Sequence, residues 1–468
     1  ILRPAEVMEF VPGLIITQHS GEGKANQYYL RGYNLDHGTD LAAWVGGMPI
    51  NMPTHGHGQG YLDLNFLTPE LISRIDYKKG PYYPEEGDFA SAGAVRIQLA
   101  DRLPSSIASG AFGSFGYRRG LLAGSPEVGG GNLLYALEYV HNDGPWKHPD
   151  DLQRFNGMLR YSRGADDNRF GVTLMAYDAD WDSTDQVAKR AVDSGLIDRF
   201  GSLDKTDGGK SSRFSLSSDW RYSSGNGFSD VSAFWIKYKM NLFSNFTYFA
   251  ADPVNGDQFE QQDRRNVFGV NAAHTWLTQW NKREVSNKIG LSLRHDDIDG
   301  VGLFATRARQ RLSTARLDDV KETAAGIFIE NNTRWHEKIR SIAGLRYDHF
   351  RFKVNSNIDA NSGSETDSKA SPKLSLIFGP WKKTEYFVNV GYGLHSNDAR
   401  GTTITVDPVT GDPADKVDPL VRTKGYELGL RTEALPGLQS SLALWQLKQD
   451  SELLFVGDAG TTEANRPS

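Results

Sequence analysis

Apolar and polar residues alternate along most of the chain, from about residue 105 almost to the end. The same period of two recurs in the segments 213–222, 350–354, 386–394 and 426–433. Because successive side chains of a strand point to opposite faces, this pattern predicts long β-strands with one apolar, aromatic-rich face. In 213–222 (RFSLSSDWRY) that face carries Phe214, Leu216, Trp220 and Tyr222.

The connections between these strands alternate in length. Hairpins begin about every 50 residues, near 105, 153, 211, 264, 319, 370 and 422. Short turns on one side and long loops on the other are typical of a transmembrane β-barrel. A soluble propeller with blades of about 50 residues is the alternative, but it has no reason for this asymmetry. The short turns are 126–131, 164–168, 223–227, 335–338, 379–383 and 435–437, and the long connections are expected at roughly 142–152, 182–210, 242–263, 297–318, 355–369 and 396–421.

Seven such hairpins predict about fourteen strands of an antiparallel barrel, within residues 101–468. A sheet in lipid must close, because an open edge leaves backbone groups without hydrogen-bond partners. Plugged outer-membrane transporters have about 22 strands. We therefore expect this chain to be a fragment of such a barrel, open at both of its ends.

The first hundred residues lack the long alternating segments and instead combine a helical spacing with short strands and turns. This pattern predicts a small α/β domain over 1–100. The segment 3–16 has the spacing of a short amphipathic helix, with Val7, Phe10 and Val11 on one side. Strands are expected at 28–33, 41–47 and 74–80, separated by turn-rich stretches.

The amino-acid composition excludes several other classes of protein. The chain has no cysteine, which excludes a disulfide scaffold, and no apolar run near the roughly 20 residues of a membrane-spanning helix. A net charge of -6 without a basic stripe argues against nucleic acid as a partner. The 49 glycines and 52 aromatic residues (Tyr 19, Phe 23, Trp 10) favour long twisted strands.

Several motifs of the first domain resemble the plug of a TonB-dependent outer-membrane receptor. The order and spacing match throughout, and three barrel segments are similar to the strand signatures of the same family. The plug motifs are EFVPGLIITQH (9–19), YYLRGYN (28–34), AAWVGGMPI (42–50) and LISRIDYKKGPYYPEEGDFASAGAVRIQL (71–99); the barrel segments are 370–378, 386–401 and 425–431.

The resemblance implies active uptake across the outer membrane of a Gram-negative bacterium, by a monomer. The energy would come from the TonB–ExbB–ExbD complex through an N-terminal TonB box that this chain does not include. The family's most frequent substrates are ferric siderophores, followed by cobalamin, haem, metal chelates and glycans. No cofactor is required, although a metal or metal chelate would be bound as substrate. The partners are then outer-membrane lipid and a small-molecule or metal-chelate ligand.

The resemblance also implies a latch between plug and barrel. Arg31 and Lys79 match two basic plug positions that pair with barrel glutamates in the family, and Glu427 alternates away from its apolar neighbours toward the lumen. There are departures: Gly46 stands where the plug usually has Asp, Lys79 where it usually has Arg, and the small-residue loop carries Glu85, Glu86 and Asp88.

The stretch NMPTHGHGQGYLD (51–63) follows the strand ending at Ile50, and its glycines predict accessible, mobile imidazoles. In the plug it would face the extracellular side, as a substrate-contacting loop, a metal site or a merely hydrated loop. Neutral imidazoles bind zinc, copper or iron, but His55 and His57 alone are too few. The substrate-contacting residues would be Asn51, His55, His57, Gln59, Tyr61 and His37; further metal ligands would come from Asp36 and Asp40 beside His37, or from His19, His141 and His148.

Two other function classes remain open from the residues alone. A passive channel or adhesin would share the barrel but not the plug-like residues 28–99. A metal-dependent hydrolase would use His55 and His57 with a third ligand, yet the chain has no G-x-S-x-G, Walker or H-E-x-x-H motif. We therefore expect a receptor rather than an enzyme.

Overall fold

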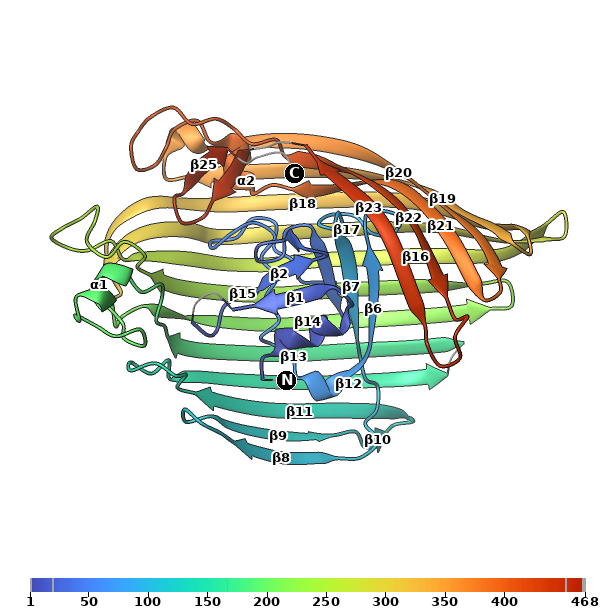
Figure 1. The fold of residues 1–468 in the computed structure, drawn as a ribbon, viewed down its shortest axis with the longest axis horizontal. Coiled ribbons are helices and arrows are strands. Elements are labelled where there is room, and N and C mark those ends of the chain that lie inside the picture. Colours follow the sequence, from blue (N-terminus) through green and yellow to red (C-terminus); the bar gives the residue numbers. More distant parts are fainter. Residues whose placement is uncertain (1, 19–20, 166, 451–452, 465–468) are drawn as a thin grey trace.

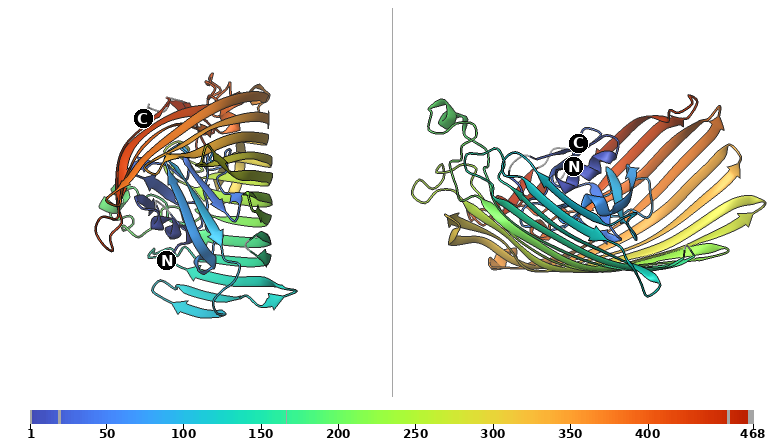
Figure 2. Two further views of the ribbon diagram at one scale, coloured as in Figure 1. Left: turned by 90° about the vertical axis from the view of Figure 1, so that its right-hand side faces the viewer. Right: turned by 90° about the horizontal axis from the view of Figure 1, so that it is seen from below.

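The computed structural model describes residues 2–18, 21–165, 167–450 and 453–464. Its strands form two small sheets, one large sheet and a separate hairpin. The large sheet curves, and the small sheets lie on its concave side (Figures 1 and 2). No helix among the described residues has the length and apolar character needed to cross a membrane.

The first domain contains two small sheets. One has the order β1–β2–β3; the other has the order β5–β4–β7–β6, in which β4 and β7 are parallel. β7 ends at Leu99, and the large sheet begins eight residues later, at Ile107. The elements are η1 (Pro4–Phe10), β1 (Leu14–Thr17), β2 (Gln27–Leu30), β3 (Tyr33–Asn34), β4 (Leu41–Val45), β5 (Met48–Pro49), η2 (Pro69–Leu71), β6 (Ile72–Lys79) and β7 (Gly93–Leu99).

Three details of this domain differ from expectation. The predicted helix over 3–16 is only the 3-10 helix η1, because Val11 precedes a proline, which disfavours helical backbone there. Val7 and Val11 are buried, but Phe10 is 72% exposed. The expected strand at 28–33 is a hairpin that turns at Arg31, whose φ is 55°.

The backbone conformation at Gly46 suits both glycine and the aspartate that is usual in the family. Gly46 opens the turn between β4 and β5 with φ of 54°, a left-handed conformation that favours glycine, asparagine and aspartate.

The large sheet has 16 strands. Fifteen of them, from β8 to β23 without β10, lie side by side in chain order, and β10 pairs only with β11. The strands are β8 (Ile107–Phe112), β9 (Arg118–Gly124), β10 (Glu127–Val128), β11 (Gly131–Asn142), β12 (Leu152–Ala165), β13 (Asn168–Asp182), β14 (Gly208–Ser224), β15 (Gly227–Ser244), β16 (Phe259–Trp280), β17 (Arg283–Arg307), β18 (Gln310–His336), β19 (Ile339–Ser356), β20 (Gly363–Trp381), β21 (Thr384–Ser396), β22 (Leu420–Thr432) and β23 (Ser440–Gln449). The loops add α1 (Lys189–Asp193), η3 (Asp359–Asn361) and α2 (Ala399–Thr403), and the separate hairpin β24 (Leu453–Val456) and β25 (Thr461–Ala464) lies beside α2 (Figure 1).

The alternating pattern located most strands, but one predicted strand and two predicted connections differ from the structure. The first predicted strand is split into β8 and β9 by a turn with φ of 56° at Phe115 and 67° at Gly116. The long loop expected at 297–318 is instead a continuation of β17 and β18, which pair as far as Arg307 and Gln310. The 355–369 connection is also shorter, since β20 begins at Gly363.

The outer face of the large sheet is apolar in rows that run across neighbouring strands. Ile289 of β17 pairs with Ile329 of β18, which pairs with Leu345 of β19, and all three side chains are exposed. Large aromatic residues gather where the short turns lie, as expected where a lipid-facing band meets water. These exposed aromatics are Trp220, Tyr222, Trp276, Trp280, Trp335, Trp381 and Tyr386.

The inner face of the large sheet, which we call the wall, is polar. A cavity of about 1080 Å³ lies between this wall and the first domain, which we call the plug. The plug-side lining includes Trp44 and Arg96, and the wall contributes Arg160, Asp219 and Lys288. Charges of both signs line this space, so its surface suits water rather than an apolar core.

Candidate functional site

The histidine loop is closed by a bridge between Met52 and Tyr61. Asn51 organises it: its amide oxygen accepts from Ala43 N (2.8 Å), and its amide nitrogen donates to the carbonyls of Gly38 and Leu41 at 3.0 and 2.9 Å. Asn51 is therefore buried and holds backbone, rather than presenting its amide to solvent.

His55 is fully buried, so the prediction that the loop's imidazoles are accessible and mobile is wrong for this residue. Its ring stacks on Tyr61, with centroids 3.9 Å apart and planes 9° apart. Burial lowers the pKa of His55 well below its ordinary value, and the positive charge of Arg265 acts in the same direction. His55 is thus neutral, and its Nδ1 accepts from the backbone N–H of His57 at 3.1 Å.

Tyr61 is also buried, and its hydroxyl accepts from the N–H of Ala25 at 2.9 Å. Burial raises the pKa of Tyr61 well above its ordinary value, and the charge of Asp63 adds to this. Gln59 is buried, and its amide oxygen accepts from the N–H of Asp398 at 3.3 Å. Both residues tie the loop to its surroundings.

His57 is the more accessible histidine of the loop. Its Nε2 lies 3.1 Å from Nε2 of His37, and its Nδ1 lies 2.8 Å from Oε1 of Gln261. His37 is buried, which lowers its pKa, while the charge of Asp36 opposes that shift. The structure therefore brings His37 and His57 together, as the sequence allowed.

The loop is bonded to the wall at Thr54 and Gly56. Thr54 O accepts from Arg265 Nη2 at 2.5 Å, and its hydroxyl donates to the Glu322 carboxylate. The N–H of Gly56 donates to Asp263 Oδ2 at 3.1 Å. Arg265 also pairs with Asp263, and both side chains are fully buried. Two strands of the wall, β16 and β18, thus form hydrogen bonds with the same short stretch of the plug, Thr54 to Gly56.

A second set of contacts lies beside the first. Arg400 of α2 donates to the carbonyl of His55 at 2.7 Å and pairs with Asp398, whose carboxylate accepts from the N–H of His55 at 3.3 Å. Arg294 of β17 donates to the carbonyl of Asn51 at 2.7 Å. We call these contacts the clamp; it comprises plug residues Asn51, Thr54, His55 and Gly56 with Asp263, Arg265, Arg294, Glu322, Asp398 and Arg400.

The latch residues show a different arrangement. Arg31 Nη1 lies 2.6 Å from Glu427 Oε2, and the guanidinium lies 5.5 Å from the ring centre of Trp445. Lys79 makes no ion pair within the described part of the chain; its ammonium lies 5.5 Å from the ring centre of Tyr77. The pairing of Lys79 with a barrel glutamate stays a prediction, since the charge of Glu427 acts on the Lys79 ammonium without a direct ion pair among the described residues.

The carboxylates of the small-residue loop make the contacts that Lys79 does not. Glu85 pairs with Lys78 in the plug and with Lys288 of β17, and Glu86 pairs with Arg96 at 2.8 Å. Asp88 accepts from the backbone N–H of Ser396 at 2.7 Å. Glu85 and Asp88 thus join plug to wall, whereas the Glu86 carboxylate pairs within the plug.

The remaining candidate ligands lie elsewhere. Asp40 pairs with His395 at 3.0 Å, and His148 lies 3.8 Å from Asp182. His19 lies outside the described residues. The structure therefore places neither Asp40 nor His148 at the histidine loop.

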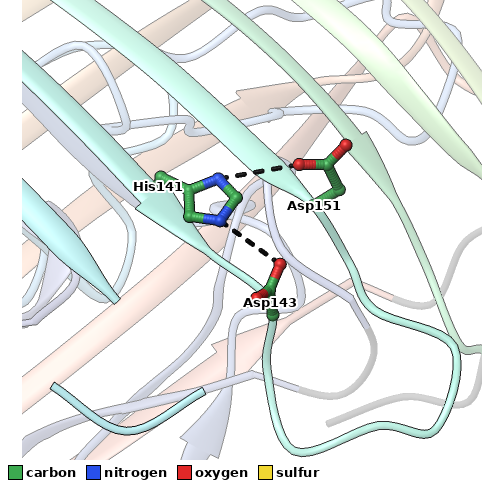
Figure 3. Close-up of side chains that lie close together, drawn as sticks. All are labelled: His141, Asp143 and Asp151. Atoms are coloured by element: carbon green, nitrogen blue, oxygen red, sulfur yellow. Dashed lines mark ion pairs between the residues drawn. The ribbon is translucent and has the colours of Figure 1, made fainter. Parts of the chain in front are cut away.

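His141 points between two carboxylates at the end of β11 (Figure 3). Its Nε2 lies 3.3 Å from Asp143, and its Nδ1 lies 3.6 Å from Asp151. Each ring nitrogen thus faces its own carboxylate.

Comparison with known families places this geometry in context. The model described as the TonB-dependent Receptor Plug Domain matches residues 2–94, and the model described as TonB dependent receptor-like, beta-barrel, matches residues 140–466. The chain belongs to the TonB-dependent receptor family. This family and fold are those of receptors and transporters, not of enzymes, and the fold is characteristic of the Gram-negative outer membrane.

Solved structures agree with the receptor fold. The unliganded ferric citrate transporter FecA superposes with a TM-score of 0.76 at 14% identity, over 95% of this chain and 67% of that chain. The copper transporter OprC gives 0.72 at 17% identity, over 97% and 70%. The ferric yersiniabactin receptor FyuA from Yersinia pestis gives 0.71 at 14% identity, over 96% and 71%. At these identities the likeness shows the fold alone.

The clamp of this receptor is the part that the sequence did not indicate. Its partners lie more than 200 residues apart along the chain, as Gly56 and Asp263 do. On the inner face, charged residues resemble ordinary solvated positions of a strand. The acids Glu85, Glu86 and Asp88 did give a signal, since they stand in a loop where the family has small residues.

Proposed function

We propose that this receptor takes up a metal chelate, with a ferric siderophore as the leading case, in an energy-coupled step across the outer membrane. The clamp is the observation that carries this proposal. A passive channel or an adhesin has no need of a separate domain bonded across its lumen by buried charges. The printed titles of structural relatives name ferric citrate, copper and ferric yersiniabactin, which supports a metal or metal chelate as cargo.

The location in the outer membrane determines which partner supplies the energy for uptake. The outer membrane holds no nucleotide supply or ion gradient, so the work of moving the plug must come from the inner membrane through TonB, ExbB and ExbD. The ligand would meet the plug at His57, the most accessible imidazole of the loop, because His37, Gln59 and Tyr61 are buried.

The pair of Arg31 and Glu427 serves as a releasable latch in this proposal. Its side chains are 19% and 7% exposed, in a polar lumen, so we expect a coupling energy of about 1 kcal/mol. A double-mutant cycle with Arg31→Gln and Glu427→Gln, read from plug unfolding in the full-length receptor, measures it. Coupling above about 3 kcal/mol would indicate a permanent anchor instead of a latch.

Uptake by cells tests the function itself. The full-length gene is expressed in a receptor-deficient host, and accumulation of radiolabelled metal is followed with ferric siderophores, a haem source, cobalamin, zinc and copper. We expect accumulation of one metal chelate that disappears in a tonB deletion strain and after a protonophore. Accumulation that persists without TonB would instead establish a passive channel.

A further inference from the structure

Three cationic side chains point away from the plug on two neighbouring wall strands. On β15, Lys237 and Lys239 are exposed, whereas Tyr238 between them is buried on the plug side. On β16, Arg264 is exposed beside Arg265, which is buried in the clamp. Because successive side chains of a strand point to opposite faces, all three cations lie on the outer face of the wall. We call Lys237, Lys239 and Arg264 the outer cations.

The register of the two strands places two of these charges against each other. Lys239 and Arg264 are direct cross-strand partners on the outer face. Like charges directly opposite each other destabilise a sheet, and an anion bound between them would remove that repulsion. Lys237 stands on the same face, two residues along β15. The outer cations therefore form one compact group of positive charge.

No carboxylate within the described part of the chain forms an ion pair with the outer cations. Other outward cations do have such partners: Lys210 of β14 pairs with Asp180, and Lys321 of β18 pairs with Asp297 at 3.3 Å. Asp178, the exposed acid in the same row as Lys239, lies two strands away on β13. The outer cations are therefore open to an anion that comes from outside the protein.

The position of the outer cations along the wall indicates where that anion comes from. On the neighbouring strand β14, outward residues from Tyr222 to Phe214 cover the roughly 9 to 11 residues that a barrel strand needs to cross a bilayer. Ser212, the next outward residue, is the cross-strand partner of Lys239. Lys239 therefore lies just beyond the apolar band, at the end with the long loops, which is extracellular in such barrels. Headgroups of the outer leaflet lie at this level.

The surface next to the outer cations suits the apolar part of a lipid. Trp235 and Phe268 are cross-strand partners on the membrane side of Lys237, and Phe268 is 48% exposed. The ring of Phe214 lies 5.6 Å from that of Trp235 and extends this aromatic surface onto β14. The alkyl stem of Lys237 can lie along these rings while its ammonium group stays at headgroup level. Charge and apolar surface are thus adjacent, as they are in an anionic lipid.

We propose that Lys237, Lys239 and Arg264 bind the phosphate of a phosphorylated lipid in the outer leaflet, whose acyl chains pack against Trp235 and Phe268. The planar guanidinium of Arg264 suits two parallel hydrogen bonds to phosphate oxygens, and the ammonium groups act as point charges. A free phosphate ion would leave the aromatic surface unused. The site depends on the outer-membrane location and not on the proposed uptake of a metal chelate, so either can fail without the other.

Binding of diphosphoryl lipid A to the purified full-length receptor in detergent tests the site. Native mass spectrometry compares it with dephosphorylated lipid A, with inorganic phosphate as competitor. We expect the wild type to prefer the diphosphoryl form by about tenfold or more. Lys239→Gln/Arg264→Gln should weaken binding of that form about 25-fold, since each cation near a charged lipid surface contributes about fivefold. Lys382→Gln/Lys383→Gln, which removes two exposed cations from a short turn, is the matched control and should bind as wild type does.

Four results would overturn the site. They are equal affinity of the wild type for the two lipids, an unchanged preference in Lys239→Gln/Arg264→Gln, an equal loss in the control, and displacement of the lipid by inorganic phosphate. Urea unfolding in phosphatidylcholine vesicles separates lost binding from lost folding. There Lys239→Gln/Arg264→Gln should unfold at the same or a higher urea concentration than the wild type, because the cross-strand repulsion is gone. A lower midpoint would show that the two charges stabilise the wall without a lipid phosphate, against the proposal.

Discussion

Replacing Arg265 with methionine should loosen the plug more than any other single change considered for this receptor. Arg265 is fully buried, pairs with Asp263 and Asp296, and holds the carbonyl of Thr54. Its removal leaves the buried Asp263 without a guanidinium, and breaking a buried pair in this way costs about 3 to 5 kcal/mol. The measurement is the plug transition in calorimetry of the full-length receptor, together with ion conductance in planar bilayers.

The matched control is Arg334→Met. Arg334 pairs with Glu284 between neighbouring wall strands at 3.2 Å, with side chains 57% and 73% exposed. Exposed pairs contribute about 0 to 1 kcal/mol, so this variant should keep the wild-type transition and stay closed to ions. Equal behaviour of the two variants would mean that the clamp does not hold the plug.

Replacing Ile329 with arginine should impair insertion of the wall into lipid. Ile329 lies seven residues from the end of β18 at His336, close to the middle of the roughly 9 to 11 residues that a barrel strand needs to cross a bilayer. Its side chain is exposed within the outward apolar row. An arginine at the bilayer midplane costs about 2 to 4 kcal/mol. Urea unfolding of the full-length receptor in lipid vesicles measures the change.

Leu312 provides the control on the same strand. It is similarly exposed but lies two residues from the start of β18, at the far end from the aromatic residues of the short turns. Leu312→Arg should therefore cost about 0 to 1 kcal/mol. A loss as large as that of Ile329→Arg would contradict this placement of the lipid band.

The sequence predicted the wall well because lipid on one side and a wet lumen on the other impose a strict period of two. That argument fails where β17 and β18 extend beyond Asp297. Val301, Leu303 and Phe304 are all buried there, so neighbouring positions of β17 do not alternate, and Arg311, which pairs with Glu260, resembles a loop residue. The turn at Ala308 and Arg309 carries no glycine, although both residues have positive φ.

The site was predicted in part. Proximity in sequence placed His55 and His57 in one loop, but exposure was inferred from glycine content alone. Gly56 is needed for another reason: a Cβ there would meet the carbonyl oxygen of Gln262 at 2.7 Å, so the glycine permits close approach to the wall. Local composition cannot reveal a partner that only the folded barrel supplies.

Movement of the plug against the wall is the central claim, and a reversible cross-link tests it most directly. The chain has no cysteine. Ser91 of the plug and Thr423 of β22 are fully buried, and their hydroxyls are 3.0 Å apart, so cysteines at both positions are close enough to be joined by a disulfide. The control variants carry only one of the two cysteines.

The measurement is radiolabelled metal-chelate uptake by cells that express full-length Ser91→Cys/Thr423→Cys, before and after reduction. We predict that the oxidised receptor still binds the chelate but does not accumulate it, that reduction restores uptake, and that both single variants behave as wild type. Wild-type uptake with the disulfide fully formed would contradict the account, because the plug would then not need to leave the wall.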